Sequence, residues 1–155
     1  MIDANTYIKV QEADFSLAQE YQALITGNSQ DGAVVTFCGL VRDMNAEQTV
    51  KSLFLEHYPG MTEKSLQAII EQARDKWPLG RVRVVHRVGK LDVSEQIVFV
   101  GVTSQHRQAA FQGAEFIMDY LKVQAPFWKK ESSDTGEYWV ESKQSDDQKA
   151  KSWES

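Results

Sequence analysis

The chain has 155 residues, a formal net charge of −5 and a single cysteine, Cys38. Its composition, 42% hydrophobic and 10% aromatic, is that of an ordinary globular domain and not of a disordered chain. One cysteine excludes an internal disulfide, a zinc site of several thiolates and a Cys-x-x-Cys redox pair, so we expect a reducing, cytoplasmic location. The acidic total argues against general nucleic-acid binding. We expect neither a signal peptide nor the run of ~20 apolar residues that spans a membrane.

The first half of the chain combines strands with one short helix. Asp14 or Ser16 is a suitable N-cap for that helix. Alternating, helical and continuous apolar patterns then predict the following elements: a strand at 6–12, a helix at 15–25, a buried strand at 32–41, a polar connection at 43–50 and a strand at 50–58.

The second half begins with a clear amphipathic helix, capped by Thr62 and ended by Pro78 and Gly80. The same criteria predict a helix at 62–77, strands at 81–88 and 96–103 joined by a short connection, a helix at 104–123, and a strand pair at 126–132 and 137–141 around DTGE.

The strands come in pairs between the helices, which favours an α+β architecture with a mostly antiparallel sheet over a doubly wound parallel one. No internal repeat and no linker interrupts the pattern before about residue 142. We therefore predict one domain over 1–142 and a polar C-terminal tail over 143–155, with room for a short helix.

Standard catalytic motifs are absent. The sequence has no GxxxxGK[ST], no GxGxxG after a strand, no GxSxG and no HExxH. The three histidines, His57, His86 and His106, do not have metal-ligand spacing. We predict no metal site and no cofactor.

One face of the helix at 104–123 carries a distinctive stripe. At 100° per residue, Arg107, Phe111, Met118 and Lys122 fall within about 60° of one another. The N-terminus of the helix favours an anion. We expect the break after Ala125 to let the chain fold back. That fold would bring Lys129 near Lys122, in a cationic pocket that suits a phosphorylated, aromatic small molecule.

Simpler interpretations remain open. Phe111 and Met118 could instead be core residues, and Lys122 and Lys129 could be ordinary solvated surface lysines. Arg107 fits a surface ion pair, and Arg42 fits a solvated strand end. His106 fits an ordinary capping residue. A basic stretch has two interpretations as well, a solvated strand face or a docking surface for an acidic partner; its six cations, against Asp75 alone, are Arg74, Lys76, Arg81, Arg83, Arg87 and Lys90.

Several long segments resemble a known family. They are DGAVVTFCGLVRD, LEHYPGMTEKSL, KWPLGRVRVVHRVG, IVFVGVTSQHR and FIMDYLKVQAPFWKKE. With the spacing between them, they cover nearly the whole chain and resemble the large, catalytic subunits of molybdopterin synthase. The resemblance implies an α/β hammerhead fold with a small additional β-subdomain.

The resemblance also implies a sulfurtransferase of molybdenum cofactor biosynthesis. Enzymes of this family convert cyclic pyranopterin monophosphate into the molybdopterin dithiolene. The sulfur arrives as a thiocarboxylate at the Gly-Gly C-terminus of a small, ubiquitin-like sulfur-carrier subunit. Two large subunits form a homodimer within a heterotetramer, and the pocket draws on both. A non-catalytic module that binds a phosphorylated ligand on the same scaffold remains the alternative.

Family roles carry over to matching positions. Lys122 resembles the pocket lysine beside the thiocarboxylate, and Lys129 resembles the second essential lysine. Three further residues, Arg42, His106 and Arg107, resemble the set that binds the pterin phosphate. The apolar walls of the pocket match Phe37 and Met118. Cys38 receives no role, because the sulfur comes from the partner; a small buried side chain is its simplest interpretation.

Overall fold

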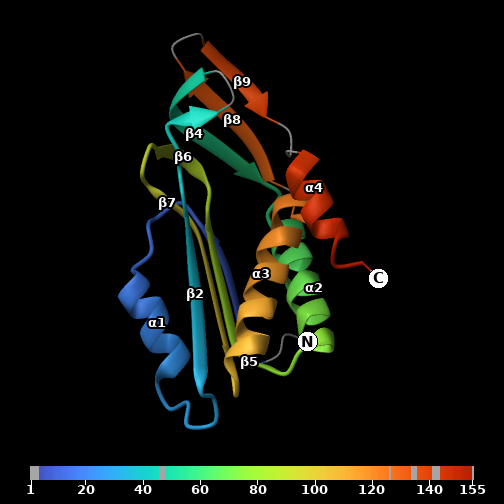
Figure 1. Cartoon of the computed structure of the whole chain (residues 1–155). Coiled ribbons are helices and arrows are strands. Elements are labelled where there is room, and N and C mark those ends of the chain that lie inside the picture. The colour runs from blue at the N-terminus through green and yellow to red at the C-terminus, as the bar shows by residue number, and fades with distance from the viewer. Residues whose placement is uncertain (1–3, 46–47, 126, 134–135, 141–143, 155) are drawn as a thin grey trace.

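The computed structural model of the chain describes residues 4–45, 48–125, 127–133, 136–140 and 144–154. Two sheets and four helices make up this part of the chain (Figure 1). In chain order the elements are β1 (Thr6–Gln11), α1 (Leu17–Ile25), β2 (Ala33–Leu40), β3 (Met44–Asn45), β4 (Gln48–His57), α2 (Met61–Lys76), β5 (Leu79–Arg87), β6 (Gly89–Asp92), β7 (Gln96–Ser104), α3 (Arg107–Gln124), β8 (Phe127–Ser133), β9 (Gly136–Val140) and α4 (Gln144–Lys151).

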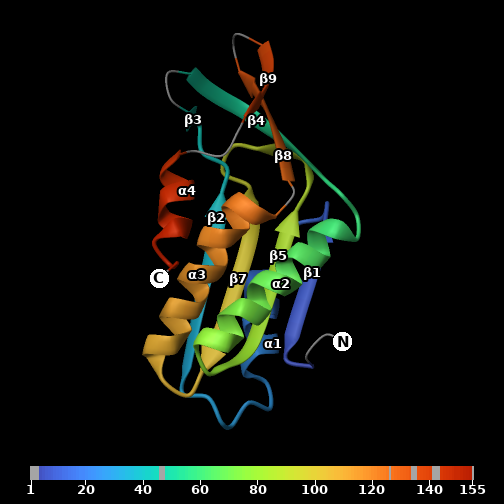
Figure 2. The same ribbon diagram turned by 90° about the vertical axis from the view of Figure 1, so that its right-hand side faces the viewer.

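The first sheet has the strand order β1-β5-β7-β2. Its β1–β5 pair is parallel, and the β5–β7 and β2–β7 pairs are antiparallel. Helices α2 and α3 cover one face, while α1 lies on the other (Figures 1 and 2). The strand β2 forms one edge of this sheet, and its outer side pairs with no described strand.

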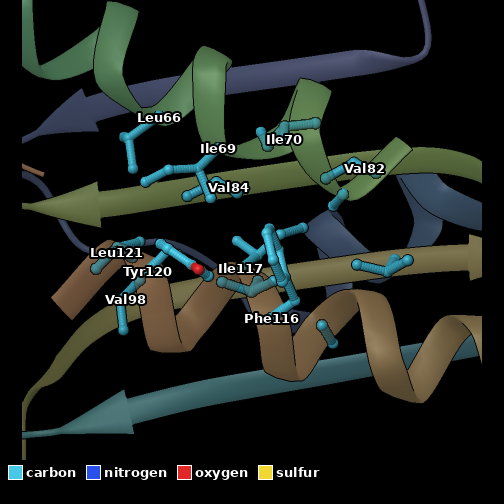
Figure 3. Packing of buried hydrophobic residues seen from close by; sticks show 14 of the residues in the cluster. Leu66, Ile69, Ile70, Val82, Val84, Val98, Phe116, Ile117, Tyr120 and Leu121 are labelled. Carbon is cyan, nitrogen blue, oxygen red and sulfur yellow. The ribbon is translucent and has the colours of Figure 1, made fainter. Parts of the chain in front are cut away.

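The main core fills the space between this sheet and helices α2 and α3 (Figure 3). Side chains from alternate strand positions, such as Val82 and Val84, meet Ile70 of α2 and Ile117 of α3. Each of these four is at most 1% exposed. Burial of an aliphatic side chain of this size contributes roughly 1.5–3 kcal/mol, so this layer holds α3 firmly against the sheet.

The second sheet lies above the first in Figure 1 and contains β3, β4, β8 and β9, with β6 paired to β4. All of its pairings are antiparallel. A smaller apolar cluster around Leu53, Leu55 and Leu91 lies beneath it. The α+β prediction with a mostly antiparallel sheet is confirmed, and the second sheet corresponds to the small additional β-subdomain.

Some predicted boundaries are wrong. Gly60, not Thr62, is the N-cap of α2, because its φ of +86° suits glycine and its N–H donates to Glu63 Oε1 at 3.1 Å. Thr62 is buried and accepts from the Tyr58 amide instead. Helix α3 begins at Arg107 rather than at residue 104, because β7 continues to Ser104 and His106 is the N-cap.

Two segments predicted as connections contain short strands. The polar stretch 43–50 includes β3 and the start of β4, and the connection 89–95 includes β6. Strands β3 and β6 both pair with β4, so cross-strand hydrogen bonds stabilise them although their local sequence favours strands only weakly. Residue 126 of the predicted strand pair and residues 134–135 of its DTGE turn lie outside the described residues.

The C-terminal segment folds back onto α3. Trp153 packs edge-on against Trp77 and Phe116, with ring centroids 5.5 and 5.6 Å apart. Its Nε1 donates to Asp119 Oδ2 at 2.6 Å, and Lys149 Nζ lies 2.5 Å from Glu115 Oε1. These contacts attach α4 and the residues after it to the C-terminal half of α3. A domain boundary after residue 142 stays a prediction, and 141–143 lie outside the described part of the chain.

Candidate functional site

Three of the predicted site residues lie at the upper end of the molecule in Figure 1, where α3 ends and the second sheet begins. Lys122 occupies the last turn of α3, and its side chain is exposed. Lys129 on β8 and Arg42, which follows β2, are exposed as well. Three exposed cations are therefore carried by segments that meet near the junction between the two sheets.

The chain turns at Ala125 between the two lysines. The Phe127 amide donates to the Ala125 carbonyl at 2.9 Å, and β8 begins at Phe127. From there β8 continues toward the second sheet and does not fold back along α3 (Figures 1 and 2). Lys122 and Lys129 thus lie on either side of the α3–β8 junction, a different path from the predicted one.

His106 and Arg107 lie at the opposite end of α3. His106 is the N-cap without a side-chain capping bond, and Arg107 is the first helical residue; both are exposed. The first turn contains no acidic side chain, which leaves the positive end of the helix dipole uncompensated. Lys122 follows Arg107 by fifteen positions of helix, about 22 Å along the axis. One chain therefore brings Arg42 of the predicted phosphate-binding set to the end that carries the lysines, but not His106 and Arg107.

The apolar residues of the predicted site differ in exposure. Phe37 of β2 is 42% exposed, whereas Met118 of α3 is partly buried against the main core. The core interpretation of Phe111 is wrong, since its side chain is 60% exposed. Phe37 and Leu40 leave apolar surface on an edge strand whose outer side pairs with no described strand.

Sequence reasoning missed two histidines at the upper end. His86, near the end of β5, is 5% exposed and stacks on Phe127, with ring centroids 3.8 Å apart and planes 19° from parallel. His57 lies opposite Phe127 in the β4–β8 ladder. The sequence could have predicted that His86 is buried, because the alternation of Val82, Val84 and His86 places it on the same face of the strand as the core valines.

Burial determines the charge of His86. It lowers the pKa of the imidazole, helped by the positive charges of Lys129 and His57 and opposed by the hydrogen bond to the Arg87 carbonyl, and the result is a pKa of about 4. The ring is therefore neutral at neutral pH. Its Nδ1 lies 2.8 Å from the Arg87 carbonyl oxygen, which only accepts, so Nδ1 carries the proton and Nε2 carries a lone pair.

The basic stretch is not a uniformly solvated face, because its four arginines bind groups of their own chain, whereas Lys76 and Lys90 are exposed. Arg74 donates to the carbonyls of Leu79 and Gly80, and Arg81 donates to carbonyls at the end of α1. Arg83 pairs with Glu20 at 2.9 Å. Such bonds satisfy carbonyls that helix and strand ends leave open, so positive charge in the sequence is not charge available to a ligand.

Neither Lys122 nor Lys129 lines either of two open depressions in the part of the chain that the structure describes. The larger, about 470 Å³, lies at the lower end between Asn28, Asp31, Arg81 and Gln105. It is open and polar, and its arginine already binds the carbonyls of α1. The upper end is the better functional candidate, because it carries three exposed cations, Arg42, Lys122 and Lys129.

The part of the chain that the structure describes shows neither a metal-binding cluster nor a membrane-spanning helix. Its residues include no cluster of three or more His, Cys, Asp or Glu side chains suited to a metal ion. No described helix is long and apolar enough to cross a membrane. Cys38 is half-buried beside the cluster under α1, where burial raises the pKa of its thiol.

Comparison with known sequences decides the family. The sequence model described as "MoaE protein" matches residues 10–124, well over half of the chain. The chain belongs to the MoaE protein family. The molybdopterin synthase catalytic subunit of Vibrio cholerae is 59% identical over 147 residues, covering 95% of this chain and 97% of the relative. That of Escherichia coli is 55% identical, covering 97% and 99%.

Solved structures of MoaE proteins have the same fold. A molybdopterin biosynthesis MoaE protein from Burkholderia ambifaria superposes with a TM-score of 0.82 at 46% identity, covering 96% of this chain and 97% of that one. Molybdopterin synthase from Staphylococcus aureus superposes with a TM-score of 0.79 at 33% identity, covering 84% and 94%. The predicted resemblance to molybdopterin synthase large subunits is confirmed.

Proposed function

We propose that the chain is the catalytic subunit of a molybdopterin synthase. It transfers sulfur from the C-terminal thiocarboxylate of a small, ubiquitin-like subunit to cyclic pyranopterin monophosphate, in the cytoplasm. Membership of the MoaE family over nearly the whole chain carries this proposal. Arg42, Lys122 and Lys129 at one end of the molecule support it, because they are the cations that the reaction requires.

The chemistry explains why lysines suit this position. Attack of the thiocarboxylate sulfur on the pterin side chain moves negative charge between the two reactants. Ammonium groups fixed beside that charge stabilise the transition state more than the ground state. Lys122, at the end of a helix packed on the sheet, and Lys129, within a β-ladder, are both carried by rigid elements. We assign both to this electrostatic role.

A second copy of the chain completes the site in this proposal. His106 and Arg107 are too far along α3 to reach the substrate held by Lys122 of the same chain. A two-fold axis perpendicular to β2 would set two copies antiparallel. The start of α3 in one copy would then lie beside the end of α3 in the other. The exposed edge of β2, with Phe37 and Leu40, supports a homodimer across this strand.

The decisive experiment mixes this chain with its thiocarboxylated small subunit and cyclic pyranopterin monophosphate, and measures dithiolene product. We expect Lys122→Ala to lose nearly all product formation while thermal unfolding and binding of the small subunit stay unchanged. Lys9→Ala is the matched control, because Lys9 is an exposed lysine on β1, the opposite edge of the sheet.

Two outcomes would contradict the proposal. Near-normal activity of Lys122→Ala would remove the role of this lysine. Binding of the pyranopterin without any product from the unaltered chain would instead favour the alternative, a non-catalytic module that binds a phosphorylated ligand.

A further inference from the structure

The ring stack between His86 and Phe127 links the first sheet to the strand that carries Lys129. A centroid distance of 3.8 Å and an interplanar angle of 19° describe two rings in face-to-face contact. Aromatic pairs contribute about 0.5–1.5 kcal/mol beyond the area that they bury. Phe127 is the first residue of β8, so this contact lies where the second sheet leaves α3.

The lower ring of this stack is held rigidly. His86 lies on β5, which pairs on one side with Val10 of β1 and on the other with Val98 of β7. Its Nδ1–H donates to the Arg87 carbonyl. Arg87 is itself fixed, since its guanidinium donates to the Glu12 carbonyl at 3.1 Å and to the Gln96 carbonyl at 2.9 Å. The imidazole is therefore a fixed platform.

The upper ring sets the path of β8. In the β4–β8 ladder, Phe127 lies opposite His57 and Lys129 lies opposite Leu55. Residues two apart in a strand point to the same face and are separated by about 6.6 Å. The side chain of Lys129 therefore leaves β8 on the side where Phe127 meets His86. A shift of Phe127 would carry Lys129 with it.

We propose that His86 is a positioning residue: its ring holds Phe127 and thereby fixes Lys129 at the upper end of the molecule. This inference rests on the proposed role of Lys129 in sulfur transfer. The groups that face the imidazole are Lys129 of β8 and His57 of β4. A neutral ring adds no positive charge beside them, so the platform orients the lysine without repelling it.

The test distinguishes the effect of the aromatic ring of His86 from the effect of its volume. His86→Leu removes the ring at similar volume, and His86→Phe restores a ring. With saturating thiocarboxylated small subunit at pH 7.5, we expect His86→Leu to lower kcat about tenfold while KM for the pyranopterin stays within twofold. His86→Phe should recover kcat to within about threefold of the unaltered chain.

A control distinguishes positioning from general stability. Phe15 is 7% exposed and packs its ring on Phe99, 5.9 Å away, in the layer under α1. Phe15→Leu should lower the thermal unfolding temperature as His86→Leu does, with kcat within twofold of the unaltered chain. A normal kcat for His86→Leu, an equal loss of kcat in Phe15→Leu, or no recovery in His86→Phe would each overturn the inference.

An independent measurement keeps the inference separate from the proposed function. After ¹³C-methylation of the lysines, the NMR signal of Lys129 is assigned by its loss in Lys129→Arg. His86→Leu should shift or broaden that signal and leave the signal of Lys9 unchanged. An unmoved Lys129 signal overturns positioning. Full activity of Lys129→Ala, by contrast, overturns the catalytic role of Lys129, whatever the signal does.

Discussion

The two ends of α3 carry the cations that the sequence assigns to one site, yet their surroundings differ. At the upper end, Lys122 lies beside the junction of two sheets, close to the strand that carries Lys129. At the lower end, Arg107 begins the helix two positions after Gln105, which lines an open polar depression. The helical repeat places residues on one face correctly but does not measure distance along the axis. In the proposed function, each end therefore supplies one half-site: Lys122 and Lys129 form the upper half-site, and His106 and Arg107 form the lower one.

The largest effect should come from recombining these half-sites. Lys122→Ala and Arg107→Ala chains, each inactive alone, are mixed under conditions that exchange subunits. In a mixed dimer one site carries both changes and the other carries neither. With random exchange, we expect about a quarter of the unaltered activity, measured as dithiolene product.

A second mixture provides the control for this result. Lys122→Ala combined with Lys129→Ala should regain nothing, because both residues belong to the same half-site and every site then lacks one lysine. Absence of recovery in the first mixture, with mixed dimers demonstrated by mass spectrometry, would contradict a site shared between two copies. Recovery of activity in both mixtures would show that Lys122 and Lys129 do not belong to the same half-site.

A smaller effect concerns His86, the buried and uncharged ring at the upper end, and the pH dependence of the free energy of unfolding. The pKa of His86 falls from an ordinary value of 6.5 to about 4. Between these values the unfolded chain binds a proton that the folded chain does not. The free energy of unfolding should therefore be fully maintained above pH 6.5 and decrease as the pH falls to 4, by about 3 kcal/mol.

Urea unfolding of His86→Phe isolates this contribution. The variant lacks the titrating ring, so its free energy of unfolding should change less between pH 7 and pH 4 than that of the unaltered chain, by the same amount. Both proteins are compared at one concentration, because dimerisation also stabilises. Parallel pH dependence in the two proteins would show that His86 is protonated as easily in the folded chain as in the unfolded one.

Local patterns predicted most of the fold, because strand alternation and helical spacing reflect burial directly. The pairs β5–β7 and β8–β9 and helices α1, α2 and α3 follow from such patterns. The short strands β3 and β6 did not, since their pairing with β4 is set by tertiary contact. For the same reason, the arginines of the basic stretch read as surface charge, whereas three of them bind backbone carbonyls of distant segments.

The candidate site was predictable only in part. The resemblance supplied the roles of Lys122 and Lys129, and the structure places both at the upper end. The distance between Lys122 and Arg107 is a property of helix length and of assembly, which no motif encodes. His86 was overlooked as a residue of the site because its role depends on a stack with Phe127, 41 positions away in the chain.

The smallest effect concerns the helix that joins the two ends. Trp153→Phe removes the hydrogen bond from Nε1 to the Asp119 carboxylate but keeps an aromatic ring against Trp77 and Phe116. A hydrogen bond to a charged group contributes about 1.5–3 kcal/mol, so the unfolding temperature should fall by a few degrees. Because the lost hydrogen bond ends on Asp119 and involves neither Lys122 nor Arg107, kcat should stay within twofold. A loss of kcat above fivefold at unchanged small-subunit binding would show that α4 helps to set the spacing between the two half-sites.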